Sequence, residues 1–423
     1  MAKKDRGGRI TLKNIIPKNL LQVILLLLLV VNVGLFTFWL RGKKIGQKSP
    51  QTYSEVAELS GKQFTFKDLS NYFSALAQDK GAEYGFEVLK GAELPPNIDM
   101  HLLAHVVGDI LFKQQGLEGI SVCTHDFRNA CSHSIVVGLF LEEGEGALDK
   151  IAETCRQAPG GSGAYTMCFH GLGHGVLAYT GYEMEKAVEL CKKTGTSEYN
   201  NAEYVQCVGG VTMEMTGGVH DIALWQEKSK VYFKDDDPLY PCNADFMPDE
   251  VKSMCYVYLT PHLLQLAGAD IGFPTQEDYK TAFPYCDRLP KDDGANRDAC
   301  YGGFGKEFVV LAQARDIRKI DQINEKQMKD VYDWCLLADN RGGSAACMIH
   351  AMNSLYWGGE NDRDAAIGFC GVMTEPYYQK SCYMGLINAV SFYIDDYDYR
   401  EGFCQELPDG YREDCQQRLT LKN

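Results

Sequence analysis

Residues 168–179 read CFHGLGHGVLAY, a cysteine followed by a segment of small and apolar residues. Segments of the same kind begin at other cysteines, for example CYGGFGKEFVVL at residues 300–311 and CYMGLINAVSFYI at residues 382–394. Apolar residues in these segments recur at helical rather than alternating spacing, which predicts helices. Segments that end at the preceding cysteine of each pair, such as MEKAVELC at residues 184–191, also have helical spacing.

The sixteen cysteines form eight consecutive pairs, each of which encloses a polar loop of 7 to 15 residues. In the chain-entropy model, closing such a loop restricts the unfolded chain by about 3 kcal/mol. We therefore predict sequential disulfides, although other connectivities are open to a chain with this many cysteines. The predicted bonds are Cys123–Cys131, Cys155–Cys168, Cys191–Cys207, Cys242–Cys255, Cys286–Cys300, Cys335–Cys347, Cys370–Cys382 and Cys404–Cys415.

The spacing of the cysteines also predicts the fold class. The second cysteine of each pair recurs after 33 to 48 residues, which is the period of two-helix repeats. Strand-like runs bounded by Asn-Gly turns are missing from the sequence. We expect an all-α domain over residues 63–423, built as an array of disulfide-linked helical hairpin repeats of the α-solenoid or α/α-toroid kind.

The N-terminal region predicts a membrane anchor. Residues 20–40 form an apolar run of 21 residues, long enough to cross a bilayer at about 1.5 Å per residue. A basic tail, residues 1–19, precedes this run, and a polar tether, residues 41–62, follows it. Because basic residues favour the cytoplasm and dense, even-numbered cysteines favour an oxidising compartment, we expect a single-pass protein with a cytoplasmic N-terminus. The main domain would then be periplasmic or extracellular.

Charge limits the class of partner. Residues beyond 44 contain 33 basic and 56 acidic residues, a net charge of −23. A domain this acidic lacks the basic surface that nucleic-acid binding requires, and it contacts a membrane through the N-terminal helix alone. A later tyrosine-rich and acidic part indicates either a surface for an envelope protein or glycan, loose calcium binding, or an ordinary solvated helix end. Its residues include Tyr377, Tyr378, Tyr383, Tyr393, Asp395, Asp396, Asp398 and Tyr399.

Five of the nine histidines form a pattern in the first part of the domain. His101 and His105 lie four apart on a helix that we expect from Asp99 to Gly116. His170 and His174 are also four apart, and His133 has the same position relative to its cysteine as His170. Residues four apart share a helix face, so each pair can offer two nitrogens to one metal ion.

The imidazole-rich set predicts a transition metal ion, such as zinc, copper or iron, or a haem. Asp109, one turn beyond His105, is expected to complete the ligand shell or to orient a histidine from behind. Gly171 and Gly175 would let a neighbouring helix approach the histidines closely. However, glycines also occur without histidine in CVGGV, residues 207–211, which favours a structural interpretation in which these side chains merely pack.

Several known site types are excluded by the sequence. A zinc protease needs glutamate directly after the first histidine, but Leu102 and Gly171 occupy those positions. The chain also lacks any CxxC or GxSxG motif. Two functions therefore stay open. The first is a metal- or haem-binding protein, whether or not it is also a metal-dependent enzyme, for which Asp126 or Glu214 would be a candidate base. The second is a non-catalytic cell-envelope scaffold or binding protein with structural histidines.

Overall fold

The computed structural model of the protein describes residues 53–124, 126–157, 161–217, 220, 222–270, 273–357, 363–394 and 396–420. Within these ranges every regular element is a helix, which confirms the predicted all-α class. In the same part of the chain, no helix has the length and apolar character needed to cross a bilayer. The predicted basic tail, residues 1–19, and the predicted anchor, residues 20–40, lie outside the described residues.

The chain divides into two units, Met1–Ser54 and Glu55–Asn423. In the described part of the chain, four α-helices precede the first disulfide: α2 Ser54–Leu59, α3 Phe66–Lys80, α4 Ala82–Gly91 and α5 Met100–Gln115. Helix α2 falls within the expected tether, yet its Leu59 is buried and its Glu55 pairs with Lys80 of α3. The packed domain therefore begins before residue 63, where the sequence analysis placed its start.

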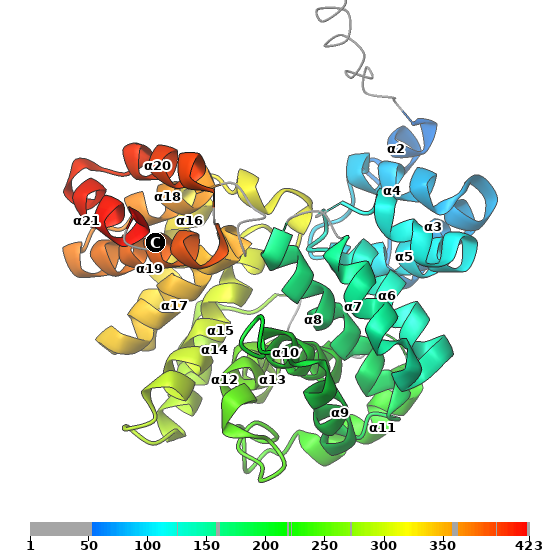
Figure 1. The fold of residues 1–423 in the computed structure, drawn as a ribbon, viewed down its shortest axis with the longest axis horizontal. Helices are drawn as coiled ribbons and strands as arrows, with labels where there is room; N and C mark the ends of the chain where they lie inside the picture. Colours follow the sequence, from blue (N-terminus) through cyan, green and yellow to red (C-terminus); the bar gives the residue numbers. More distant parts are fainter. Residues whose placement is uncertain are drawn as a thin grey trace, which may run out of the picture. The chain divides into compact units, whose positions relative to one another are not determined.

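Helix α5 has the ends that the sequence predicts. The Asp99 side chain accepts a hydrogen bond from the backbone N–H of Leu102 at 3.0 Å, which satisfies an N–H group that has no partner inside the helix. Gly116 ends the helix with a φ of 59°, a conformation that glycine adopts without steric cost. Figure 1 shows α5 next to α6, the helix of the first disulfide pair.

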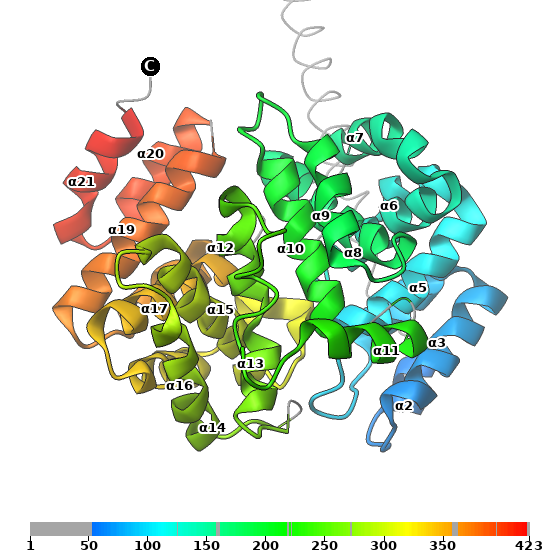
Figure 2. The ribbon, with the colours of Figure 1, turned by 90° about the horizontal axis from the view of Figure 1, so that it is seen from below.

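Eight helices contain the second cysteine of a pair, and we call them the inner helices. They are α6 Ala130–Glu143, α8 Gly161–Tyr179, α10 Ala202–Gly217, α12 Asp249–Tyr258, α15 Gly294–Ala312, α17 Arg341–Leu355, α19 Pro376–Tyr393 and α21 Asp409–Thr420. Helix α6 begins one residue before its cysteine, and the other seven begin 5 to 7 residues before theirs. Figures 1 and 2 show the inner helices following one another in chain order, and each packs against the next.

The remaining helices lie between the inner ones in the sequence. They are α7 Leu148–Arg156, α9 Met184–Cys191, α11 Ile222–Tyr232, α13 Thr260–Leu266, α14 Gln276–Ala282, α16 Glu325–Cys335, α18 Arg363–Gly371 and α20 Tyr397–Glu406. Five of these contain the first cysteine of a pair in their last turns, namely α7, α9, α16, α18 and α20. Asp396 caps α20, which agrees with the interpretation of the acidic run as a solvated helix end.

All eight predicted disulfides are present, and no cysteine is free. The Cα atoms of each pair lie 5.4 to 5.7 Å apart, the separation that an ordinary disulfide requires. Each bond joins an inner helix to the segment that precedes it in the chain.

Glycines let the inner helices cross closely. A Cβ added to Gly171 of α8 would lie 2.6 Å from the ring of His133 on α6, and one added to Gly173 would lie 2.0 Å from the carbonyl oxygen of Cys207 on α10. Gly175 faces α6 in the same way, with side-chain atoms at 3.3 Å. The three glycines of CFHGLGHG thus serve contacts on two sides of one helix. Their cost in helix propensity, up to about 1 kcal/mol each, is offset by this packing.

The array bends so that segments far apart in the sequence meet. The backbone N–H of Asn97, before α5, donates to the carbonyl of Ala314, after α15, at 2.8 Å. The Arg128 guanidinium, before α6, donates to the Ser354 hydroxyl at the end of α17 at 2.6 Å. These contacts enclose a central region into which several inner helices direct side chains.

Candidate metal centre

Six buried or nearly buried histidines lie together at the centre of the first repeats. They come from α5, α6, α8 and the segment after α10, and they are His101, His105, His133, His170, His174 and His220. Neighbouring ring centroids are 4.7 to 6.3 Å apart, so the imidazoles form one continuous cluster. All five histidines singled out in the sequence belong to it, and His220 joins them.

His101 and His105 face each other through their Nε2 nitrogens. The two Nε2 atoms are 3.2 Å apart. Nδ1 of His101 lies 2.7 Å from the carbonyl oxygen of Phe127, and because a carbonyl only accepts, this nitrogen carries the proton of the neutral ring. Nε2 of His101 therefore carries a lone pair that is directed at His105.

The proton of His105 is also on the far side of its ring. Its Nδ1 lies 3.0 Å from the hydroxyl of Ser134, and that hydroxyl donates its proton to the His105 carbonyl oxygen, at 3.2 Å. Ser134 therefore accepts from Nδ1, and Nε2 of His105 is a second lone pair. Two ligands on a tetrahedral zinc ion are about 3.3 Å apart, given metal–nitrogen bonds of about 2.0 Å. The observed separation suits a shared metal ion.

His133 completes a three-histidine group. Its ring centroid lies 5.8 Å from that of His101 and 5.9 Å from that of His105. One nitrogen from each of the three rings lies within 4.8 Å of the others. Both ring nitrogens of His133 are buried, and among the described residues neither makes a hydrogen bond of ordinary geometry, the nearest backbone partner being Met167. Burying an unsatisfied polar group costs about 1–3 kcal/mol, so a ligand for these nitrogens is expected.

A second group surrounds the buried carboxylate of Glu214. Its Oε2 accepts from Nδ1 of His174 at 3.0 Å and from Nδ1 of His220 at 3.1 Å. Its Oε1 accepts from the Tyr182 hydroxyl at 2.6 Å and from the backbone N–H of His220 at 3.0 Å. Nε2 of His174 and Nε2 of His220 are both buried and make no hydrogen bond with any described residue. One nitrogen of each histidine and one oxygen of Glu214 lie within 4.8 Å of one another.

The Glu214 carboxylate fixes the orientation of His174 and His220, as carboxylates commonly do for metal-binding histidines. In such sites the second ring nitrogen donates to a carboxylate, carbonyl or hydroxyl, and this bond sets the tautomer. Phe127, Ser134 and Glu214 fulfil this role for four histidines of the cluster. With four donors around it, Glu214 is an orienting group rather than a free base.

His170 and Asp109 lie at the edges of the cluster. Nε2 of His170 is 3.4 Å from the sulfur of Met213, and its Nδ1 is buried without a hydrogen bond. Asp109 interacts with Ser134 and with the charge of His220, so it is placed to orient His105 through the serine. Among the described residues, Asp109 is not part of either group of converging ligand atoms.

Burial keeps most of these imidazoles neutral. It lowers the pKa of His101 to about 3, and burial followed by the neighbouring rings lowers the pKa of His105 and His133 well below the usual range. Burial acts to raise the pKa of Glu214, but His220 and the hydrogen bonds from both histidines hold this pKa well below its ordinary value. Neutral imidazole is the form that binds metal.

The sequence patterns do not reveal every residue of the site. His220 follows α10 in an irregular segment, outside the register of the cysteines, and no local pattern links it to the others. Glu214 was considered as a base only because of its charge. Asp126, the other candidate base, pairs with Lys90 at 3.1 Å and is part of neither histidine group.

The remaining described histidines differ from the cluster. His262 stacks on Phe233 with ring centroids 4.3 Å apart. His350 on α17 packs against Gly302 on α15, where an added Cβ would lie 2.4 Å from the ring. This contact matches that of His133 with Gly171, so His350 provides a comparison for a histidine that only packs.

No protein-family model, curated protein or solved structure matches this chain.

Proposed function

We propose that this protein binds a transition metal ion through His101, His105 and His133. The observation that carries the proposal is the pair of Nε2 lone pairs, 3.2 Å apart, on His101 and His105. A proton between them would also relieve their repulsion, but burial lowers the pKa of His101 to about 3 and opposes protonation. A metal ion satisfies both nitrogens at neutral pH and gives the unpartnered His133 a role.

The geometry favours a bare ion over a haem. Neighbouring imidazole rings contact one another, and the cavity that borders His101 and His133 has a volume of about 90 Å³. Drug-sized ligands, which are smaller than a haem, usually occupy pockets of about 300–1,000 Å³. Imidazole ligands suit zinc, copper and iron, and the sulfur of Met213 beside His170 favours copper among these.

The number of proposed protein ligands is that of a catalytic rather than a structural metal centre. Structural zinc sites use four protein ligands, whereas catalytic sites use three and leave a position for water or substrate. Three histidines form the proposed ligand set, and two of them, His101 and His133, line the cavity. An ion at this place would act as a Lewis acid on a molecule bound there.

The protein is proposed to work at the outer face of a membrane as a helical-repeat domain on an N-terminal anchor, residues 20–40. The apolar run supports the anchor, and eight disulfides support an oxidising compartment. The regular order of inner helices and disulfides supports a repeat array bent toward closure. Such an array would hold ligands from several repeats around one centre.

The test is metal analysis of the full-length protein, purified with its disulfides intact and without a polyhistidine tag. We expect close to one ion of zinc, copper or iron per chain, retained in His350→Ala and lost in His105→Ala. His350→Ala is the matched control because it removes a helical histidine outside the cluster. A protein that stays metal-free after incubation with each of the three ions would reject the centre and leave the scaffold function.

A further inference from the structure

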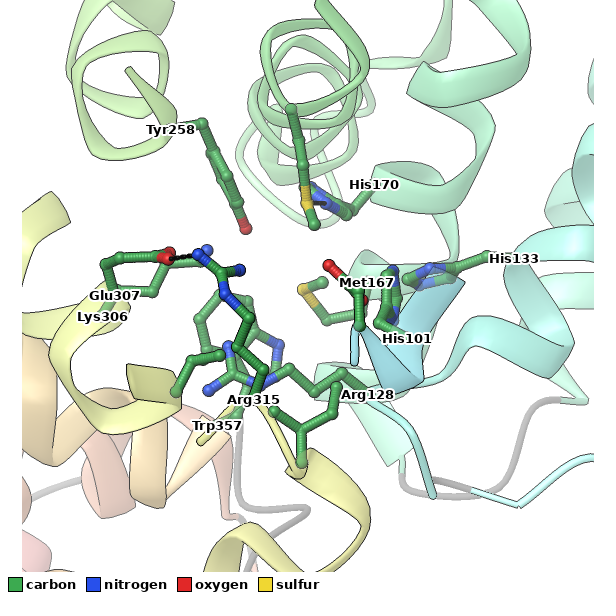
Figure 3. Close-up of a pocket in the computed structure, with 14 residues that line it drawn as sticks. His101, Arg128, His133, Met167, His170, Tyr258, Lys306, Glu307, Arg315 and Trp357 are labelled. Atoms are coloured by element: carbon green, nitrogen blue, oxygen red, sulfur yellow. Dashed lines mark hydrogen bonds and ion pairs between the residues drawn. The ribbon is translucent and has the colours of Figure 1, made fainter. Parts of the chain in front are cut away.

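Beside the histidines lies a cavity of about 90 Å³ whose opposite wall contains basic side chains (Figure 3). His101, His133 and His170 form one side of this cavity. Arg128, Lys306 and Arg315 line the other, together with the sulfur of Met167 and the ring of Trp357. The proposed metal centre and these cations therefore face the same small space.

Two of the cations have no acidic partner. Among the described residues, Lys306 makes neither a hydrogen bond nor an ion pair, and its Nζ lies 4.4 Å from the centre of the Tyr258 ring. Arg128 bonds to the Ser354 hydroxyl and lies over the Trp357 ring at 5.7 Å, again without a carboxylate partner in that part of the chain. Burial lowers the pKa of Lys306 to about 8 and that of Arg128 to about 10.

The carboxylates near the cavity do not neutralise these two charges. Glu307 is paired with Arg315 at 3.1 Å, which accounts for one acid and one base (Figure 3). Asp99 caps helix α5, and burial raises the pKa of its carboxyl group. Three basic and two acidic side chains line the cavity, so an excess of positive charge remains, and a partly buried charge without a partner is costly.

An uncharged donor completes the cavity. The Tyr258 hydroxyl points into it (Figure 3), and within the described residues this hydroxyl makes no hydrogen bond. The ring of Tyr258 stacks on His170 with centroids 4.8 Å apart, which fixes its direction. A guanidinium, an ammonium and a hydroxyl are all donors, and together they match the acceptor oxygens of an oxyanion.

We infer that this cavity binds an oxyanion, a carboxylate or phosphate group, between Arg128, Lys306 and Tyr258 and next to the histidine centre. The anion neutralises the two cations and satisfies the tyrosine hydroxyl. That the anion is a ligand or substrate of the metal ion rests on the proposed function. The anion-binding site itself rests on the basic wall alone.

The oxyanion is either free or the end of a longer molecule. A larger cavity of about 710 Å³ adjoins the first and shares Met167, Lys306 and Trp357 with it. Apolar side chains such as Ile349 and Phe392 line much of its wall. A longer molecule would place its anionic end at Lys306 and its body in this larger cavity. A free anion would use the larger cavity as its route.

The experiment is calorimetric titration of the full-length protein with acetate, inorganic phosphate and octanoate, each with and without bound zinc. We expect binding to the wild-type protein that weakens about 10- to 100-fold in Lys306→Met and in Arg128→Met, because each variant removes a charged hydrogen bond. Tyr258→Phe should weaken it less. Lys306→Arg should retain it, and Lys326→Met, at an exposed position on α16, is the control.

The outcomes separate the inference from the proposed function. Anion binding that depends on Lys306 and Arg128 in a protein that takes up no metal supports the anion site and rejects the metal centre. The inference is overturned if the protein binds metal but no anion, or if the wild-type protein and Lys306→Met bind the anion with equal affinity. Octanoate binding at least tenfold tighter than acetate assigns the larger cavity to the body of the ligand, and equal affinity assigns the site to a free anion.

Discussion

The Nε2 atoms of His101 and His105 lie 3.2 Å apart, and each ring carries its proton on the opposite nitrogen. The two residues are one turn apart on α5, so the helix itself sets their separation. Phe127 and Ser134, from the next segments of the chain, set which nitrogen is free. Two lone pairs held face to face in a buried site repel each other, and the proposed metal ion would bind both.

Metal binding should stabilise the folded protein. Because the ion binds the native state, saturation at 100 times the dissociation constant adds about 2.7 kcal/mol to the free energy of unfolding. We expect a chelator to lower the thermal midpoint of the wild-type protein and to leave that of His105→Ala unchanged. Differential scanning calorimetry with and without chelator measures both. An equal chelator effect on the two proteins would contradict a role for His105 as ligand.

Glu214 should control metal affinity without binding the ion. In Glu214→Gln, one acceptor oxygen becomes an NH₂ group that faces donors, so His174 and His220 lose their fixed orientation. Loss of such an orienting group costs about 10- to 100-fold in metal affinity. Glu203→Gln is the control, since Glu203 is a fully buried carboxylate on the same helix. Competition with a chromophoric chelator gives the affinities, and an equal loss in both variants would indicate general disruption.

Gly171 should be indispensable to the centre. In Gly171→Ala the added methyl group would meet the His133 ring at 2.6 Å and its Cα at 2.8 Å, so α6 and α8 must separate. Overpacking of this kind costs about 1–3 kcal/mol. Gly402→Ala, within α20 and without any atom within 4 Å of the new Cβ, should instead be neutral or stabilising by up to about 1 kcal/mol. Chemical denaturation and metal content distinguish the two.

Anion binding should depend on pH through Lys306. Burial, followed by the charges of Arg128 and Arg315, lowers the pKa of Lys306 to about 8, whereas Glu307 and Asp99 act to raise it. As pH rises through 8 the ammonium loses its proton, and the affinity for acetate, whose charge is constant in this range, should fall. Lys306→Arg should keep its affinity above pH 8, because guanidinium stays charged. A wild-type affinity that is flat between pH 7 and 9 would contradict the role of Lys306.

Met213 should influence which metal binds. Its thioether lies 3.4 Å from Nε2 of His170, and thioethers favour copper(I) over zinc. In Met213→Leu, which keeps the volume, we expect weaker copper(I) binding and unchanged zinc binding. Titration of each metal against a competing chelator measures the ratio. Equal changes for the two metals would place Met213 in packing alone.

Much of the fold follows from local sequence patterns. Short loops close easily, so neighbouring cysteines pair in sequence, as in Cys168 with Cys155. The ends of α5 follow from Asp99 and Gly116, whose conformational preferences act within a few residues. The start of each inner helix is less predictable, because turns before the cysteine, as at Gly161, are stabilised by packing rather than by their own composition.

The histidine pairs could be predicted for the same reason. His101 with His105, and His170 with His174, are four apart, and a helix places such residues on one face whatever surrounds it. The shared register of His133 and His170 placed them in neighbouring helices because each inner helix packs against the next. These relationships need only helical geometry and chain order.

Other parts of the site depend on contacts between distant segments. His220 reaches the cluster because Glu214 binds both its ring and its backbone N–H. Arg128 and Lys306 face one cavity because the array bends until α15 and α17 meet the segment before α6. The sequence by itself determined the helices, the disulfides and the pairs of histidines, since these are set by forces within a turn or a short loop. The tertiary structure alone decided which nitrogens stay free and which charges lack partners, because both depend on packing between residues far apart in the chain.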